Sequence, residues 1–195
     1  MKLFGSILAL ACALLGAPVS QAVPVTFFTT LDQNEPVPTG SPGTGTAVVV
    51  IDTAAHTLSL DIFFSGLLGT TTASHIHCCT PTPLTGAAGV ATQVPSFAGF
   101  PLGVQSGIYD SPLFDLTVAT SWNPAYITAN GGTPGSAEAA LFAGMLAGRS
   151  YLNIHTSRNG GGEIRGFLAV PEPASVALLG LGLLGVCFSR RKQAA

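Results

Sequence analysis

The chain has 195 residues, including 24 glycines and 14 prolines, and a formal net charge of −2. Between two distinctive terminal segments, residues 23–170 contain eight acidic and only three basic residues, for a formal charge of −5. Nucleic acids and anionic membrane surfaces bind basic clusters, so this composition argues against both as partners. The low charge and the abundance of glycine, threonine, alanine and proline indicate instead one secreted, β-rich domain.

The N-terminus has the organisation of a secretory signal peptide. A single lysine, Lys2, precedes an apolar run over residues 3–15, and Ser20 and Ala22 supply small side chains. These two residues stand at the −3 and −1 positions of a signal peptidase cut after Ala22. The apolar run is short for a membrane anchor. We therefore predict that signal peptidase removes residues 1–22 on export.

The first predicted strands follow directly. Residues 25–30 form an extended apolar segment, and residues 46–52 and 57–64 alternate apolar and polar side chains with a period of two. Such alternation, interrupted by a short turn, is typical of a β-hairpin with one buried face. His56 lies in the turn, where we expect it to be exposed. The segment rich in proline and glycine that starts at Asp32 is typical of a loop.

The middle of the chain contains two more expected strands and one helix. We expect a fourth strand at residues 74–77 and a fifth near Tyr109, broken by Pro112 and therefore at an edge or a bulge. Residues 137–147 are rich in helix formers, and Ser136 can cap the first turn. We predict one short helix there. Its core-facing side chains are expected to be Leu141 and Met145, with Phe142 and Leu146 beside them.

Residues 151–170 read as two strands joined by a glycine turn. Pairing that keeps the apolar side chains on one face sets Ile154 opposite Gly166 and His155 opposite Arg165. The polar side chains then share the outer face of this hairpin and form a polar patch: Asn153, His155, Glu163 and Arg165.

Three histidines in predicted strands are candidate metal ligands. His75 and His77 flank Ile76, so both project from one face of a strand. His155 lies in the last hairpin, and the three imidazoles converge if its strand neighbours theirs. Three histidines from strands, two of them in a His-x-His pair, are suited to hold copper or zinc.

The alternative, which the residues favour, is a polar network without a metal. In it, the histidines hydrogen-bond to the backbone or to Glu163 and Arg165, and the Arg165 charge disfavours a bound cation. The arrangement resembles copper-zinc superoxide dismutase faintly, but a bridging histidine is missing, so the likeness supports at most binding. No motif of a known catalytic class appears in the sequence, and we expect no enzymatic activity.

Two adjacent cysteines follow the His-x-His pair. Cys12 leaves with the signal peptide and Cys187 lies near the C-terminus, so the domain contains only Cys78 and Cys79. Adjacent Cα atoms lie ~3.8 Å apart, closer than the ~4.4–6.8 Å usual in disulfides. We expect a vicinal disulfide, because free thiols are disfavoured in an oxidising compartment. Thiolate ligation of a soft metal such as Cu(I), or links to another chain, are the alternatives.

The C-terminus has three parts in a specific order. A Pro-Glu-Pro motif precedes an apolar stretch over residues 174–188, which spans ~22 Å as a helix against a hydrocarbon core of ~30 Å. A basic cluster follows and would stay cytoplasmic. The residues are Pro171, Glu172 and Pro173 in the motif and Arg190, Arg191 and Lys192 in the cluster.

This order resembles a PEP-CTERM sorting signal over residues 170–195. The resemblance implies a precursor tethered to the inner membrane of a Gram-negative bacterium and cleaved by an exosortase. The product would lie at the cell surface or outside the cell, with exopolysaccharide or surface proteins as partners. A plain C-terminal membrane anchor is the alternative.

Residues 23–169 resemble a CHRD domain, first described in chordin. The resemblance rests on three motifs: His-Ile-His at 75–77, Asn-Ile-His-Thr at 153–156 and Gly-Glu-Ile-Arg-Gly at 162–166. It implies an all-β fold, an Ig-like antiparallel sandwich or barrel with one short helix, between the signal peptide and a C-terminal hydrophobic helix. Many members have glycine soon after His-Ile-His, where this chain has Cys78.

Together these features predict an exported, non-catalytic surface or extracellular-matrix protein. The alternative function is an extracellular copper- or zinc-binding module. Its candidate ligands are His75, His77 and His155, with Cys78 or Cys79 as further candidates.

Overall fold

The computed structural model describes residues 23–33, 36 and 38–171. The cut after Ala22, most of the Pro-Glu-Pro motif, the apolar stretch 174–188 and the basic cluster that follows it lie outside these residues. Among the described residues, no helix has the length and apolar character needed to cross a membrane.

The larger sheet is antiparallel and contains the predicted hairpin. Its strands are β1 (Val25–Leu31), β2 (Thr44–Asp52), β3 (Thr57–Ser65) and β5 (Gly107–Asp110), in that order, with β6 (Phe114–Asp115) also paired to β3. Apolar side chains alternate along β2 and β3, and cross-strand partners such as Val49 and Leu60 are buried together. The expected break at Pro112 is confirmed, because it separates β5 from β6, and β5 is an edge strand.

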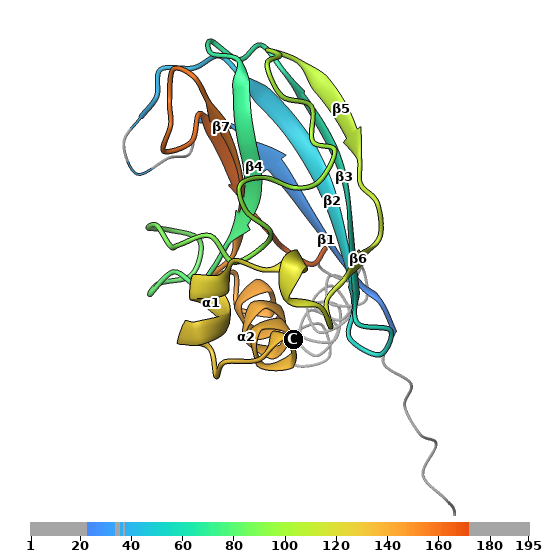
Figure 1. The fold of residues 1–195 in the computed structure, drawn as a ribbon. Coiled ribbons are helices and arrows are strands. Elements are labelled where there is room, and N and C mark those ends of the chain that lie inside the picture. Colours follow the sequence, from blue (N-terminus) through green and yellow to red (C-terminus); the bar gives the residue numbers. More distant parts are fainter. Residues whose placement is uncertain (1–22, 34–35, 37, 172–195) are drawn as a thin grey trace, which may run out of the picture.

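The smaller sheet carries the candidate site. It consists of β4 (Thr71–His77), β7 (Tyr151–Thr156) and β8 (Ile164–Phe167), in the order β4-β7-β8, all antiparallel. The two sheets face each other (Figure 1). Apolar side chains from both sheets belong to one buried cluster. Isolated bridges from Phe28 to Ala169 and from Asp32 to Arg165 join β1 and the residue after it to β8 and the segment that follows β8. The described strands thus form two antiparallel sheets, and the predicted alternative of a closed barrel is wrong.

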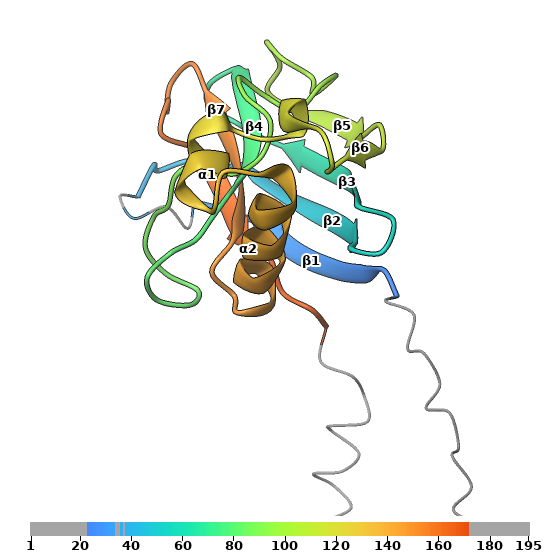
Figure 2. The ribbon, with the colours of Figure 1, turned by 60° about the horizontal axis from the view of Figure 1, so that its bottom comes forward.

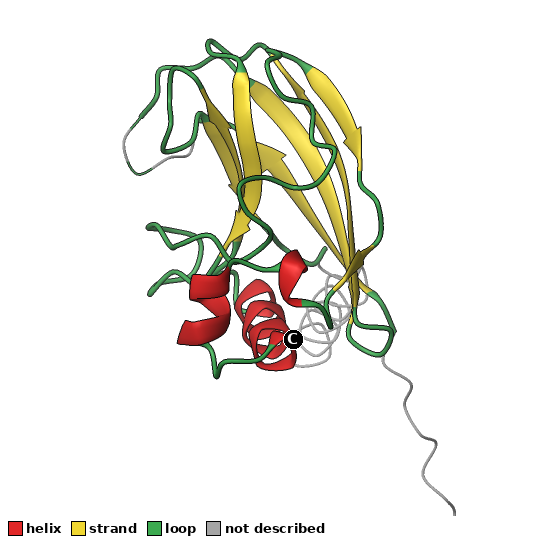
Figure 3. Ribbon diagram, in the orientation of Figure 1, coloured by secondary structure: helices red, strands yellow, loops and turns green. Residues whose placement is uncertain are grey.

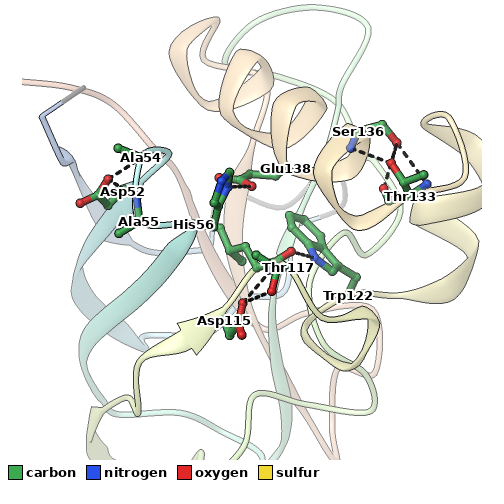
Figure 4. Close-up of polar contacts among 11 residues, drawn as sticks. Asp52, Ala54, Ala55, His56, Asp115, Thr117, Trp122, Thr133, Ser136 and Glu138 are labelled. Atoms are coloured by element: carbon green, nitrogen blue, oxygen red, sulfur yellow. Dashed lines mark hydrogen bonds and ion pairs between the residues drawn. The ribbon is translucent and has the colours of Figure 1, made fainter. Parts of the chain in front are cut away.

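Helices cover one end of the strands, and the described chain has two α-helices where we predicted one (Figures 2 and 3). α1 (Pro124–Ala129) was missed, although Asn123 caps it and Pro124 occupies its first turn. A 3₁₀ turn, η1 (Ala119–Ser121), precedes it. The indole nitrogen of the buried Trp122 next to this turn donates to the Leu116 carbonyl (2.9 Å, Figure 4).

α2 (Pro134–Leu146) begins three residues before the predicted start. Thr133, not Ser136, is its N-cap, and Ser136 completes a capping box with it (Figure 4). Proline at the first helical position is favourable, which explains the earlier start. Leu141 and Met145 face the core as predicted, whereas Leu146 is exposed.

The register of the last hairpin differs from the prediction by two residues. Ile154 lies opposite Ile164, and Asn153 lies opposite Arg165. A shift of two leaves every side chain on its predicted face, so alternation cannot distinguish the two registers. The turn decides between them, because Glu163 N donates to Ile154 O and closes the hairpin earlier than predicted.

Candidate metal centre

The smaller sheet brings the three predicted histidines together. β4 buries Ile76 in the core and therefore turns His75 and His77 to the opposite face. β7 pairs directly with β4 and presents His155 on the same face. One ligand nitrogen from each ring lies within 4.8 Å of the others. The condition for convergence, that the two histidine strands be neighbours, is met.

Backbone carbonyl groups orient all three rings. The contacts are His75 Nε2 to Pro95 O (2.6 Å), His77 Nδ1 to Ala88 O (2.9 Å) and His155 Nδ1 to Gly160 O (3.0 Å). A carbonyl oxygen only accepts, so each of these nitrogens carries the proton. Each ring therefore has a lone pair on its other nitrogen. Metal-bound histidines are oriented in the same way, with the second nitrogen donating to a carbonyl or carboxylate.

The remaining nitrogens of His77 and His155 face each other. His77 Nε2 and His155 Nε2 are 3.3 Å apart, and His75 Nδ1 is buried with no hydrogen-bond partner among the described residues. Two lone pairs at this distance repel unless a proton or a cation lies between them. Tetrahedral zinc with Zn–N bonds of ~2.0–2.1 Å places its nitrogens ~3.3–3.4 Å apart. The separation of these two nitrogens matches that spacing.

Electrostatics keep the histidines neutral. Burial lowers the pKa of His75 and His77 to about 4 and also lowers the pKa of His155. The carbonyl contacts counteract part of this effect, and the Arg165 charge lowers the pKa of His77 further. A proton is therefore disfavoured between His77 and His155 near pH 7. Neutral imidazole is the form that binds a metal.

The polar side chains around the histidines are buried. The prediction that they form a patch on the outer face is therefore wrong about their exposure to solvent. Asn153, Glu163 and Arg165 are at most 2% exposed. The Arg165 guanidinium lies over the Tyr151 ring at 4.5 Å, and its Nη1 donates to Gly86 O at 2.8 Å. Loop segments cover this face, and alternation along a strand carries no information about such coverage.

The Glu163 carboxylate holds loops together. Within the described chain it accepts hydrogen bonds from four donors, none of them a histidine: the Ser41 hydroxyl (2.6 Å), the Thr156 hydroxyl (2.6 Å), Gly69 N (3.0 Å) and Leu68 N. Burial opposes ionisation, but these four bonds outweigh it and lower the pKa of Glu163. Glu163 is thus an ionised structural group and not a partner of the histidines.

The two cysteines lie beside the centre but outside it. Cys78 and Cys79 are joined in a disulfide, and in the described part of the chain the cluster of ligand atoms contains histidine nitrogens only. Both sulfur atoms pack on Gly144 of α2, where a Cβ atom would overlap them. Glycine inside a helix ordinarily indicates only weaker helix propensity. Here Gly144 leaves room for the disulfide. The sequence does not reveal this role of the glycine.

A cavity of about 550 Å³ borders the centre. Its lining includes His77, Tyr151 and the glycine turn at Gly160. It offers an entry path for an ion, which a metal site requires. His56, the fourth histidine, is exposed as expected and lies apart from this cluster. It pairs with Glu138 through Nδ1 and Oε2 at 2.7 Å (Figure 4).

The sequence did not reveal the carbonyl groups that orient the rings. Pro95, Ala88 and Gly160 lie in loops, and every residue carries a carbonyl, so no residue type marks this role. For the glycine turn there was a weak signal, because a run of three glycines allows the backbone to approach a side chain closely.

Comparison with known families supports both resemblances. Residues 27–168 match the CHRD domain, and residues 169–192 match the PEP-CTERM protein-sorting motif. Comparison with curated proteins and with solved structures finds no match to the chain. The sorting motif implies export, processing by an exosortase and sorting to the cell surface. With most of its length matched, the chain belongs to the CHRD-domain family and carries a C-terminal PEP-CTERM motif.

Proposed function

We propose that this exported protein binds one copper or zinc ion through His75, His77 and His155 and has no enzymatic activity. The observation that carries the proposal is the arrangement of the ring nitrogens. One nitrogen of each ring is held by a carbonyl, the free nitrogens of His77 and His155 lie 3.3 Å apart, and each of the three rings offers a ligand nitrogen within 4.8 Å of the others. Neutral imidazoles with converging lone pairs are suited to a Lewis acid.

A polar network alone accounts for the site less well. In such a network each lone pair accepts a hydrogen bond, yet His75 Nδ1 has no donor among the described residues. The Arg165 charge opposes a cation, but the guanidinium donates to Gly86 O and lies over the Tyr151 and Phe167 rings. Its positive charge is therefore partly engaged by other groups.

Metal titration of the purified protein tests the proposal. We expect one equivalent of Zn(II) or copper to bind, measured by calorimetry against a competing chelator. His77→Ala should weaken binding at least ~100-fold, because it removes a ligand and not merely an outer-shell partner. The control His56→Ala removes an exposed histidine outside the cluster and should bind like the wild type. Binding no stronger than background, or unchanged binding by His77→Ala, contradicts the proposal.

A second candidate role is that of a surface or extracellular-matrix component, with exopolysaccharide or surface proteins as partners. The sorting motif at residues 169–192 supports it. We expect that replacing Pro171, Glu172 and Pro173 together with alanine blocks processing of the tail. Immunoblotting of cell fractions should then show a larger form in the inner membrane and little at the surface. Normal release of this variant contradicts the assignment, and alanine at Gln193 serves as the control within the tail.

A further inference from the structure

A fourth polar side chain lies on the same face as the three histidines. Asn153 precedes His155 by two residues in β7 and therefore projects to the same side. In the register with β4 it lies directly opposite His75. Its side chain is almost completely buried, with 1% of its surface exposed.

The amide of Asn153 has a fixed direction. Its Nδ2 donates to Gly161 O at 3.0 Å, and Oδ1 is buried with no donor among the described residues. Because the amide group is planar, the hydrogen bond that fixes Nδ2 against the Gly161 carbonyl also fixes Oδ1, which points in a different direction. The neighbouring Gly160 carbonyl orients His155. One glycine turn thus positions both the histidine ring and the amide.

A buried amide oxygen without a partner is costly and calls for an explanation. Arg165 lies opposite Asn153 on β8, but the Arg165 Nη1 donates to Gly86 O, and Asn153 Oδ1 receives no hydrogen bond from it. His75 Nδ1, on the neighbouring strand β4, is a second buried atom that has no partner among the described residues. Because Asn153 and His75 are paired across β7 and β4, a single cation between them can satisfy both acceptors.

We propose that Asn153 Oδ1 is the fourth ligand of the metal ion held by His75, His77 and His155, so that the site selects divalent ions over Cu(I). This inference rests on the proposed function. Three imidazoles and one neutral oxygen form a four-coordinate set that suits Zn(II) or Cu(II). Cu(I) is a soft ion that prefers sulfur and gains little from an amide oxygen.

Comparing Asn153→Ala with the wild type for two ions tests this proposal. Zn(II) affinity should fall ~10–100-fold, whereas Cu(I) affinity should change by less than about threefold. Cu(I) thereby serves as an internal control for the folding of the variant. Asn130→Ala, which removes an amide at the end of α1, should change neither affinity. Co(II) in place of zinc should give the visible spectrum of a tetrahedral site in the wild type and an altered spectrum in Asn153→Ala.

The outcomes separate the two proposals. If the wild type binds no metal, the proposed function fails and this inference fails with it. If Zn(II) and Co(II) bind Asn153→Ala as they bind the wild type, the histidine site stands and the role of Asn153 is refuted. Equal losses of affinity for Zn(II) and Cu(I) show that Asn153 has a structural role, and they also refute its role as a ligand. Should Asn153→Ala not fold, Asn153→Leu keeps the size of the side chain but removes the amide oxygen, so it should lose Zn(II) affinity and keep Cu(I) affinity, and unchanged Zn(II) binding by folded Asn153→Leu overturns the proposal.

Discussion

Glu163→Ala is expected to lower the free energy of unfolding by at least about 4 kcal/mol, because hydrogen bonds to a charged group contribute about 1.5–3 kcal/mol each. The wild-type carboxylate accepts bonds from Ser41 and Thr156 and from the backbone of Leu68 and Gly69. Its removal leaves buried donors without an acceptor and releases the loops of Ser41 and of Leu68 and Gly69 from the hairpin of β7 and β8. Urea denaturation followed by circular dichroism measures the loss.

The matched control for Glu163 is an exposed acid. Asp61 of β3 lies opposite Asp110 of β5, so Asp61→Asn removes a like-charge pair and should leave the stability unchanged or slightly higher. Equal stabilities of Glu163→Ala and the wild type contradict the structural role given to the Glu163 carboxylate.

Because the pKa of Glu163 is lowered in the folded state, we expect the free energy of unfolding to depend on pH. The hydrogen bonds of Glu163 hold its pKa in the folded state below the ordinary value of a glutamate. Its contribution is therefore fully present above the unfolded-state pKa of about 4.3 and is lost as the pH falls through the lower folded-state pKa. Glu163→Gln should lose this part of the acid dependence. Denaturation curves from pH 7 down to pH 3 compare the two proteins, and parallel pH profiles refute the assignment.

Gly166→Ala should destabilise the fold by about 3 kcal/mol through overpacking. A Cβ atom at Gly166 would overlap the Thr30 carbonyl oxygen and the Thr29 hydroxyl of β1. The carbonyl belongs to the backbone and cannot rotate away as a flexible side chain can. On either side of this contact, bridges from Phe28 to Ala169 and from Asp32 to Arg165 join the β1 region to β8 and the segment that follows it. Thermal denaturation measures the effect.

Another glycine serves as the control. Gly89 has no atom within 4 Å of the place where a Cβ would lie, so Gly89→Ala should change the stability by less than about 0.5 kcal/mol. If Gly166→Ala melts at the wild-type temperature, the close approach of β8 to β1 does not join the two sheets as described.

These two predictions explain the Gly-Glu-Ile-Arg-Gly motif in physical terms. Glu163 holds loops, Ile164 is buried in the core, and Arg165 lies over Tyr151. Gly166 admits β1. The motif is therefore a structural support for the sheet that carries the histidines, and none of the three clustered histidines belongs to it.

The sequence alone determined the local features of this protein. The alternation of apolar and polar side chains predicted the hairpin of β2 and β3. Proline, which cannot donate a backbone hydrogen bond, predicted the break at Pro112. Alternation also placed His75 and His77 on one face. Even the short helix α1 had a local signal, since Asn123 and Pro124 are typical of a helix start.

Only the tertiary structure decided which strands are neighbours and what covers them. His77 and His155 are 78 residues apart in the chain, and their contact depends on the pairing of β4 with β7. The register of β7 with β8 depends on the closing turn, and the burial of Arg165 depends on loops from elsewhere in the chain. Side-chain alternation is a property of one strand, with a period of two residues. Strand pairing and loop coverage bring distant segments together, so a local pattern cannot specify them.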